Sequence, residues 1–187
     1  MRIDKRLNLV IPVYRDDGSR LFVHSTPVSS DLFDTYWEPV GKAFSSIYSG
    51  GFGIIGGPRI AAKMLQKVAT EMGRWDGPKG VRMGLVAEAH RLTNVLVPRE
   101  KGGWETVPFD DARKTMLDKE DVSEIEGAIA FFTVVSLIHR RTEQAEVLAG
   151  AGGLWGAQTT SLDCTAFTNS LTTSTETESS GETQTPS

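Results

Sequence analysis

The amino-acid sequence predicts an α+β protein that is mainly α, with an N-terminal β-hairpin, a bundle of about five helices and a disordered C-terminal tail. Near the N-terminus apolar residues alternate with other residues, as in a strand with one buried face. Between residues 31 and 141 they recur every three or four positions, as in amphipathic helices. The last 30 residues contain 10 Thr and 6 Ser but no Lys or Arg. These patterns place a compact domain at residues 1–157 and a disordered acidic tail at residues 158–187.

The expected hairpin begins with the alternating residues Leu7, Leu9, Ile11 and Val13. Pro12 restricts this strand to a sheet edge or a strand end, because proline has no amide proton to donate. Asp17-Gly18 is a strong hairpin signal, since glycine accepts the positive φ that a tight turn needs. Residues 21–24 then form the return strand.

Helical periodicity covers residues 31–48, 58–72, 81–92, 109–117, 121–141 and 142–157. Residues 95–108 lack it, and we expect them to be irregular or weakly extended. The first helix carries a stripe that is expected to face the core, made of Phe33, Tyr36, Trp37, Val40, Phe44, Ile47 and Tyr48. The segment 121–141 is apolar nearly all round, which is typical of a helix at the centre of a domain or in a subunit interface.

Charge and composition disfavour nucleic-acid and membrane binding. All 20 Lys and Arg, but only 18 of the 24 acids, lie at or before Arg141, so this body carries about +2 and the remainder −6. A near-neutral body has no strong field for nucleic acid, and an acidic tail repels phosphate. The most apolar stretch, residues 127–138, is shorter than the roughly 20 residues needed to span a bilayer. The single cysteine, Cys164, excludes an intrachain disulfide and fits a reducing cytosol.

No residues are arranged as a catalytic, cofactor-binding or metal-binding site, so we predict that the chain is not an enzyme. The nearest match is Gly51-Phe52-Gly53-Ile54-Ile55-Gly56, which satisfies G-x-G-x-x-G. A phosphate-binding fingerprint follows a strand in a βαβ unit, whereas this segment follows a predicted helix. A flexible connection is therefore the preferred interpretation, with nucleotide binding as the alternative.

The histidines and the cysteine are not predicted to be reactive. His24, His90 and His139 have no metal-ligand spacing and are expected at the surface or at its boundary. Cys164 has no basic neighbour in sequence to lower its pKa, which disfavours a nucleophilic role.

Tryptophans indicate where a protein partner could bind, because they are enriched at interface hot spots. Trp37 is expected in the core, as a member of the aromatic stripe. Trp75, Trp104 and Trp155 are each flanked by glycine or charge in a turn-like stretch. These three are candidate protein-binding residues, together with Phe52 in the glycine-rich segment.

Segments at both ends of the chain carry a resemblance to a known family. The first comprises Leu7-Asn8-Leu9-Val10-Ile11-Pro12-Val13, the Asp17-Gly18 turn and Val23-His24-Ser25-Thr26-Pro27. The second comprises Leu154-Trp155-Gly156-Ala157-Gln158-Thr159-Thr160-Ser161-Leu162 and residues 167–175. They resemble the ends of tail-assembly chaperones of long-tailed, siphovirus-like bacteriophages, and the similarity extends over most of the chain.

The resemblance implies a binding protein in the cytoplasm of the infected bacterial host. Such a protein would coat the aggregation-prone helical tape-measure protein, recruit tail-tube subunits and leave before the tail is complete. Proteins of this kind are often made in two lengths by ribosomal frameshifting. The resemblance transfers no catalytic residue and no cofactor. A structural virion protein of the tail or of the head–tail connector is the alternative, and self-association is open to either.

Overall fold

The computed structural model describes residues 7–15, 18–49, 57–138, 143, 146 and 156–179. Within these ranges the side chains of residues 33, 48, 57–59 and 172–179 are not described. The predicted segment 142–157 and the glycine-rich segment 51–56 therefore lie wholly or almost wholly outside the described residues.

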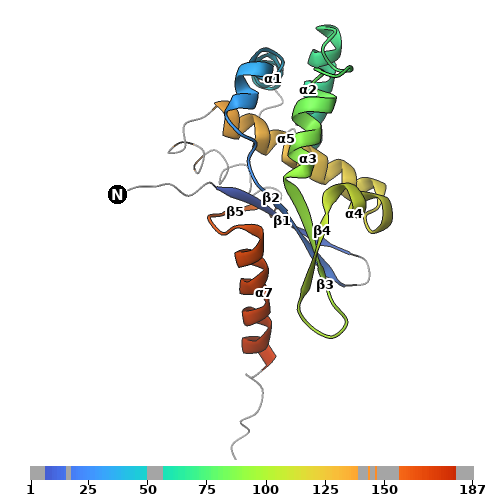
Figure 1. The fold of residues 1–187 in the computed structure, drawn as a ribbon, viewed down its shortest axis with the longest axis vertical. Coiled ribbons are helices and arrows are strands. Elements are labelled where there is room, and N and C mark those ends of the chain that lie inside the picture. Colours follow the sequence, from blue (N-terminus) through green and yellow to red (C-terminus); the bar gives the residue numbers. More distant parts are fainter. Residues whose placement is uncertain are drawn as a thin grey trace, which may run out of the picture.

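A five-stranded antiparallel sheet forms one layer of the protein (Figure 1), with the strand order β4-β3-β2-β1-β5. Its strands are β1 (Asn8–Tyr14), β2 (Arg20–Ser25), β3 (Thr93–Pro98), β4 (Trp104–Pro108) and β5 (Gln158–Thr160). β1 and β2 pair with Val10 opposite His24 and Pro12 opposite Phe22. β5 pairs only with residues Asn8 to Val10, so Pro12 lies beyond the end of that pairing. The missing amide proton of Pro12 therefore interrupts no pairing with β5.

The helices form a second layer on one face of this sheet (Figure 1). They are α1 (Asp31–Ser49), α2 (Gly57–Glu71), the π-helical turn η2 (Arg82–Val86), α3 (Ala87–Arg91), α4 (Phe109–Thr115) and α5 (Lys119–Ile138). The backbone amides of Glu120 and Asp121 both donate to Asp118 Oδ1 at 2.8 Å, which starts α5 slightly before the predicted residue 121. The structure thus confirms a mixed α and β protein with more helix than strand.

The main core lies between the sheet and the helical layer, and α5 runs through its centre. Phe132 in α5 is 1% exposed, and Ile125, Ile129 and Val135 on the same helix are also buried. They belong to one apolar cluster with Leu9, Val23 and Val95 of the sheet. The prediction that the apolar helix lies at the centre of the domain is therefore confirmed.

The region 95–108 was expected to be irregular, and this expectation is wrong because it contains β3 and β4. β3 is paired on both sides, and Val95 and Leu96, which point to opposite faces, are fully buried. A strand buried on both faces is a continuous apolar run, so it lacks the alternation that reveals a half-exposed strand. The protein is accordingly built on a five-stranded sheet, where the sequence indicated a hairpin and a helical bundle.

The second correction concerns the tail that was predicted to be disordered from residue 158. Residues 158–160 form β5, and Cys164–Ser179 form helix α7 on the sheet face opposite the other helices (Figure 1). We call this face the outer face. Its buried residues Val10, Phe22 and Leu96 pack against Trp104 of β4 and against Cys164, Phe167 and Leu171 of α7. Three apolar residues suffice to order this helix because the sheet supplies the opposing apolar surface. Residues 180–187 lie outside the described residues.

Candidate protein-binding groove

A groove of about 500 Å³ lies between α2, the η2–α3 segment, α4 and α5. One part of its lining is apolar and consists of Ala62, Leu65, Trp75, Met83, Val86, Ala87 and Ala130. The other part is polar and consists of Lys63, Gln66, Arg82, His90, Asp110, Arg113, Ser123 and Glu126. A cavity of this size accommodates a few side chains of a ligand, and its mixed lining suits an amphipathic one.

Met83 is the most exposed large apolar side chain of the groove, with 59% of its surface accessible. It projects from the π-helical turn η2, and such turns are frequent at functional sites. Gly84 next to it lies close to Tyr36 of α1: a Cβ there would come within 1.7 Å of the Tyr36 hydroxyl oxygen. The absence of a side chain at residue 84 thus lets η2 approach α1, and this contact fixes the position from which Met83 reaches solvent.

Trp75 lines the same groove at the turn that follows α2. The turn is held by backbone hydrogen bonds, in which the Val81 amide donates to the Arg74 carbonyl at 2.8 Å and the Arg82 amide donates to the Trp75 carbonyl at 3.0 Å. The indole is half-buried against the main core. Of the four sequence candidates for protein binding, Trp75 is the one that the structure places in this groove.

The polar wall of the groove is an ion cluster centred on Arg113. Its Nε lies 2.9 Å from Asp110 Oδ1, and its Nη1 lies 3.4 Å from Glu126 Oε1. His90 lies between the same two carboxylates, with Nδ1 3.6 Å from Asp110 Oδ1 and Nε2 3.9 Å from Glu126 Oε1. Burial lowers the pKa of His90, and this effect exceeds the opposing attraction of Glu126 and Asp110. His90 is therefore neutral at neutral pH, and Arg113 is the cation that lies beside both acids.

This ion cluster is suited to holding elements together. Arg113 on α4 joins α5 through Glu126, while the His90 ring packs edge-on against Phe109 at a centroid distance of 5.0 Å. The described part of the chain contains no group of three or more His, Cys, Asp or Glu side chains placed to hold a metal ion.

Among the described sequence candidates, Trp104 does not line the groove. Trp104 lies on β4, where its ring meets Phe22 edge-on at 5.3 Å on the outer face. Phe52 and Trp155 lie outside the described residues. Of these three, only Trp104 has a described position, and it lies on the outer face, apart from the groove.

Two predictions about side-chain burial are wrong. Trp37 was expected in the core but is 58% exposed, while its neighbour Tyr36 is buried. His24 and His90 were expected at the surface or its boundary, yet both are buried. His90 is covered because α4 and α5 pack over it, and the Nε2 of His24 forms a hydrogen bond with the Leu162 carbonyl at 3.1 Å. His139 lies outside the described residues.

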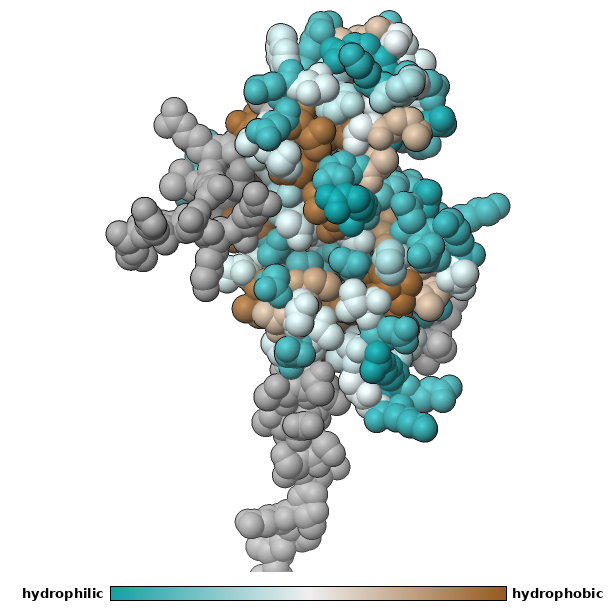
Figure 2. All heavy atoms as spheres, in the orientation of Figure 1, coloured by the Kyte–Doolittle hydropathy of each residue, from teal (hydrophilic) through white to brown (hydrophobic). Residues whose placement is uncertain are grey.

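Sequence reasoning also overlooked Met83, although a weak signal was present. Residues 81, 85 and 89 define the buried side of the predicted helix, and Met83 falls between them beside Arg82. A large apolar residue on the polar side of a helix is a candidate contact for a partner. Figure 2 shows further hydrophobic residues at the surface around α1 and α2, surrounded by polar ones.

No family model, no curated protein and no solved structure matches this chain. Of the helices that the structure describes, none is both long enough and apolar enough to cross a membrane.

Proposed function

We propose that this chain is a tail-assembly chaperone of a long-tailed bacteriophage, which binds the tape-measure protein and recruits tail-tube subunits in the cytoplasm of the infected host. The observation that carries the proposal is the groove, with a partly apolar lining and an exposed methionine at its rim. The resemblance of both chain ends to this family supports the same conclusion. The proposed partners are proteins, and the proposal needs no cofactor and no catalytic residue.

The size of the groove suits contact with one face of a helix. A helix with its side chains is about 10 Å across, so a cavity of about 500 Å³ takes a few side chains and leaves the helix axis outside. Apolar side chains at i, i+3 or i+4, and i+7 of a partner would enter together. Leu65, Val86 and Ala130 would contact them, and the flexible Met83 would adapt to different side chains.

Such a site gives weak binding between one copy of the protein and one segment of a partner, but strong binding when many copies occupy a long partner. Burying one leucine contributes about 2 kcal/mol, and association costs at least about 4 kcal/mol before any gain appears. Two or three anchors therefore give weak binding by one copy. A long helical client presents the same pattern many times, so many copies bind along it and neighbouring copies can reinforce one another. Because the attraction is mainly apolar, we expect binding to survive moderate salt.

The groove is tested by one substitution at each of two exposed methionines. Met83→Glu places a charge at the rim of the groove, whereas Met116→Glu makes the same change at a 36% exposed methionine outside it. Each variant is co-expressed with the tape-measure protein of the same phage, and the amount of soluble tape-measure protein that co-purifies is measured. We expect Met83→Glu to reduce it about tenfold, as a loss of about 1.4 kcal/mol implies, and Met116→Glu to leave it unchanged. Equal retention by both variants, with unchanged melting temperatures, would remove the groove from the proposal.

The role in assembly is tested in the phage itself. An early stop codon in this gene should give heads filled with DNA but no tails, and the protein should be absent from finished particles. Normal tails in the mutant lysate would contradict the proposal. Stoichiometric amounts of this chain in purified virions would instead support a structural protein of the tail or the head–tail connector.

A further inference from the structure

We propose that the outer face of the sheet is a second helix-binding site, which α7 occupies until a partner helix with a longer apolar stripe, at i, i+3, i+7 and i+11, displaces it. This surface is separate from the groove, and the inference does not require the partner to be a tape-measure protein. The arrangement of α7 in this chain shows which kind of helix fits the surface.

The outer face is an apolar patch with an aromatic floor. Val10, Phe22 and Leu96 form a buried cluster that is separate from the main core. The Trp104 ring meets the Phe22 ring edge-on at 5.3 Å, and the Arg20 guanidinium carbon lies 4.8 Å from the centroid of the Phe22 ring. Without α7, these apolar side chains would face solvent, which favours covering them with a helix.

The described contacts of α7 with this patch come from the apolar stripe of the helix. Its apolar residues on the sheet are Cys164, Phe167 and Leu171, spaced i, i+3 and i+7, and all three are only half-buried. Phe167 meets Phe22 edge-on at 5.8 Å. The next position of the stripe is Thr175, and residues 172–179 are Ser, Thr and Glu. Ser and Thr are weaker helix formers than Ala or Leu, so a partner helix with a longer apolar stripe should bind this face better.

The chain just before α7 is anchored to the sheet by hydrogen bonds from buried side chains. The Leu162 carbonyl accepts hydrogen bonds from Asn8 Nδ2 at 2.8 Å and from His24 Nε2 at 3.1 Å, and both side chains are buried. The Ala166 amide donates to Asp163 Oδ1 at 2.8 Å, which caps the start of the helix. α7 can therefore leave the sheet by rotation at residue 163 while β5 and the Leu162 contacts stay in place.

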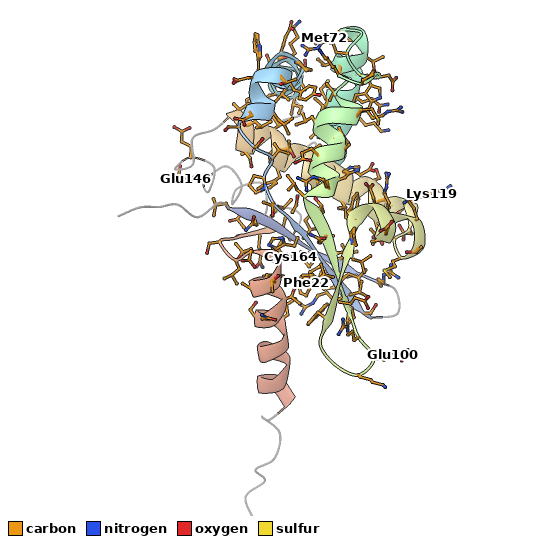
Figure 3. The ribbon with its side chains drawn as sticks, viewed as in Figure 1. Phe22, Met72, Glu100, Lys119, Glu146 and Cys164 are labelled. Atoms are coloured by element: carbon orange, nitrogen blue, oxygen red, sulfur yellow. The ribbon has the colours of Figure 1, made fainter. Side chains whose placement is uncertain are left out.

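The position of α7 leaves room for this movement. It extends from the sheet away from α1–α5 (Figure 1), and its described contacts with the outer face come from Cys164, Phe167 and Leu171 in its first two turns. Figure 3 shows Cys164 and Phe22 close together where the helix meets the sheet. An incoming helix could approach along the face that these first turns cover.

The native cysteine allows α7 to be locked reversibly in the full-length chain. The Cys164 thiol is within hydrogen-bonding reach of the Thr106 hydroxyl on β4. Thr106→Cys should therefore form a disulfide with Cys164 under oxidation and hold α7 on the sheet. Thr106→Ser is the matched control, because it keeps the hydroxyl and cannot form the disulfide.

The probe is a fluorescent peptide of residues 161–179 carrying Cys164→Ala and Thr175→Leu, which extends the apolar stripe by one turn. Fluorescence anisotropy measures its affinity for each chain, oxidised and reduced. We expect reduced Thr106→Cys to bind it and oxidised Thr106→Cys to bind about tenfold or more weakly, since the lock removes the binding-competent state. Thr106→Ser should bind equally under both conditions.

A second variant weakens the competitor within the chain. Phe167→Ala removes the aromatic contact of α7 with the sheet, so the peptide should bind this chain several-fold more tightly. Equal affinity of oxidised and reduced Thr106→Cys would overturn the inference. So would the absence of binding to the reduced chain at peptide concentrations up to about 1 mM. Oxidised Thr106→Cys that migrates as a disulfide-linked dimer would likewise overturn the assignment of α7 to its own chain.

Discussion

Truncating Phe132 to alanine should remove one of the largest fully buried side chains from the centre of the protein. The ring is 1% exposed, and Ile125, Ile129 and Val135 of the same helix are packed around the core with it. Phenylalanine-to-alanine changes in such positions cost about 3–5 kcal/mol, and the cost rises when neighbours cannot close the cavity. We expect Phe132→Ala to lower the free energy of unfolding by about 4 kcal/mol, because the helix that carries the surrounding side chains is packed on several sides and cannot move to close the cavity. At about 2–4 °C for each kcal/mol, the melting temperature should fall by roughly 8–16 °C.

The neighbouring phenylalanine provides the control for this measurement. Phe131 lies on the same helix and is half-buried, so Phe131→Ala should cost about half as much. Urea unfolding followed by tryptophan fluorescence gives the free energy of unfolding of both variants and of the wild type. A loss below about 1 kcal/mol for Phe132→Ala, or a larger loss for Phe131→Ala, would refute the central position of α5. Unchanged stability with altered self-association would instead identify α5 as a subunit interface.

Two further predictions concern local packing and pH. Gly84→Ala should destabilise the protein by about 1–3 kcal/mol, because its Cβ would meet the Tyr36 hydroxyl, and Tyr36→Phe in the same chain should recover part of this loss in thermal melts. Burial lowers the pKa of both His24 and His90 below the ordinary value of 6.5. The unfolded chain therefore takes up protons that the folded chain resists, so the free energy of unfolding should be fully present above pH 6.5 and decline as the pH falls below it. His90→Gln should flatten this decline in urea titrations at about pH 7.5 and about pH 5.5, and a decline equally steep in the variant would show that His90 does not contribute.

Local patterns in the sequence were sufficient to predict an element where one of its faces is buried and the other is exposed to solvent. The alternation in residues 7–13 and the Asp-Gly turn indicated two paired strands, and β1 and β2 do pair. The apolar run before residue 139 indicated a central helix, and α5 is buried. In each case the periodicity of the side chains directly reflects burial.

The same rules failed where covering depends on residues far away in the chain. β3 was missed because it is buried on both faces and shows no alternation. α7 was missed because a Ser- and Thr-rich segment cannot bury much apolar surface alone, and the apolar sheet face that orders it comes from residues 60 or more positions earlier. The composition of a segment shows how much apolar surface its own side chains can bury. It does not show how much apolar surface distant elements provide for the segment to pack against.

The sequence by itself determined the mixed class, the central helix and Trp75 as a candidate contact. Only the tertiary structure decided which side of each element faces solvent. In α1, the spacing of three and four residues is compatible with burial of either Tyr36 or Trp37. The close approach of η2 at Gly84 buries Tyr36, and Trp37 stays exposed. The groove and the outer face exist for the same reason: each joins elements that are separated in the chain, and whether such a surface is covered depends on long-range packing that no local periodicity records.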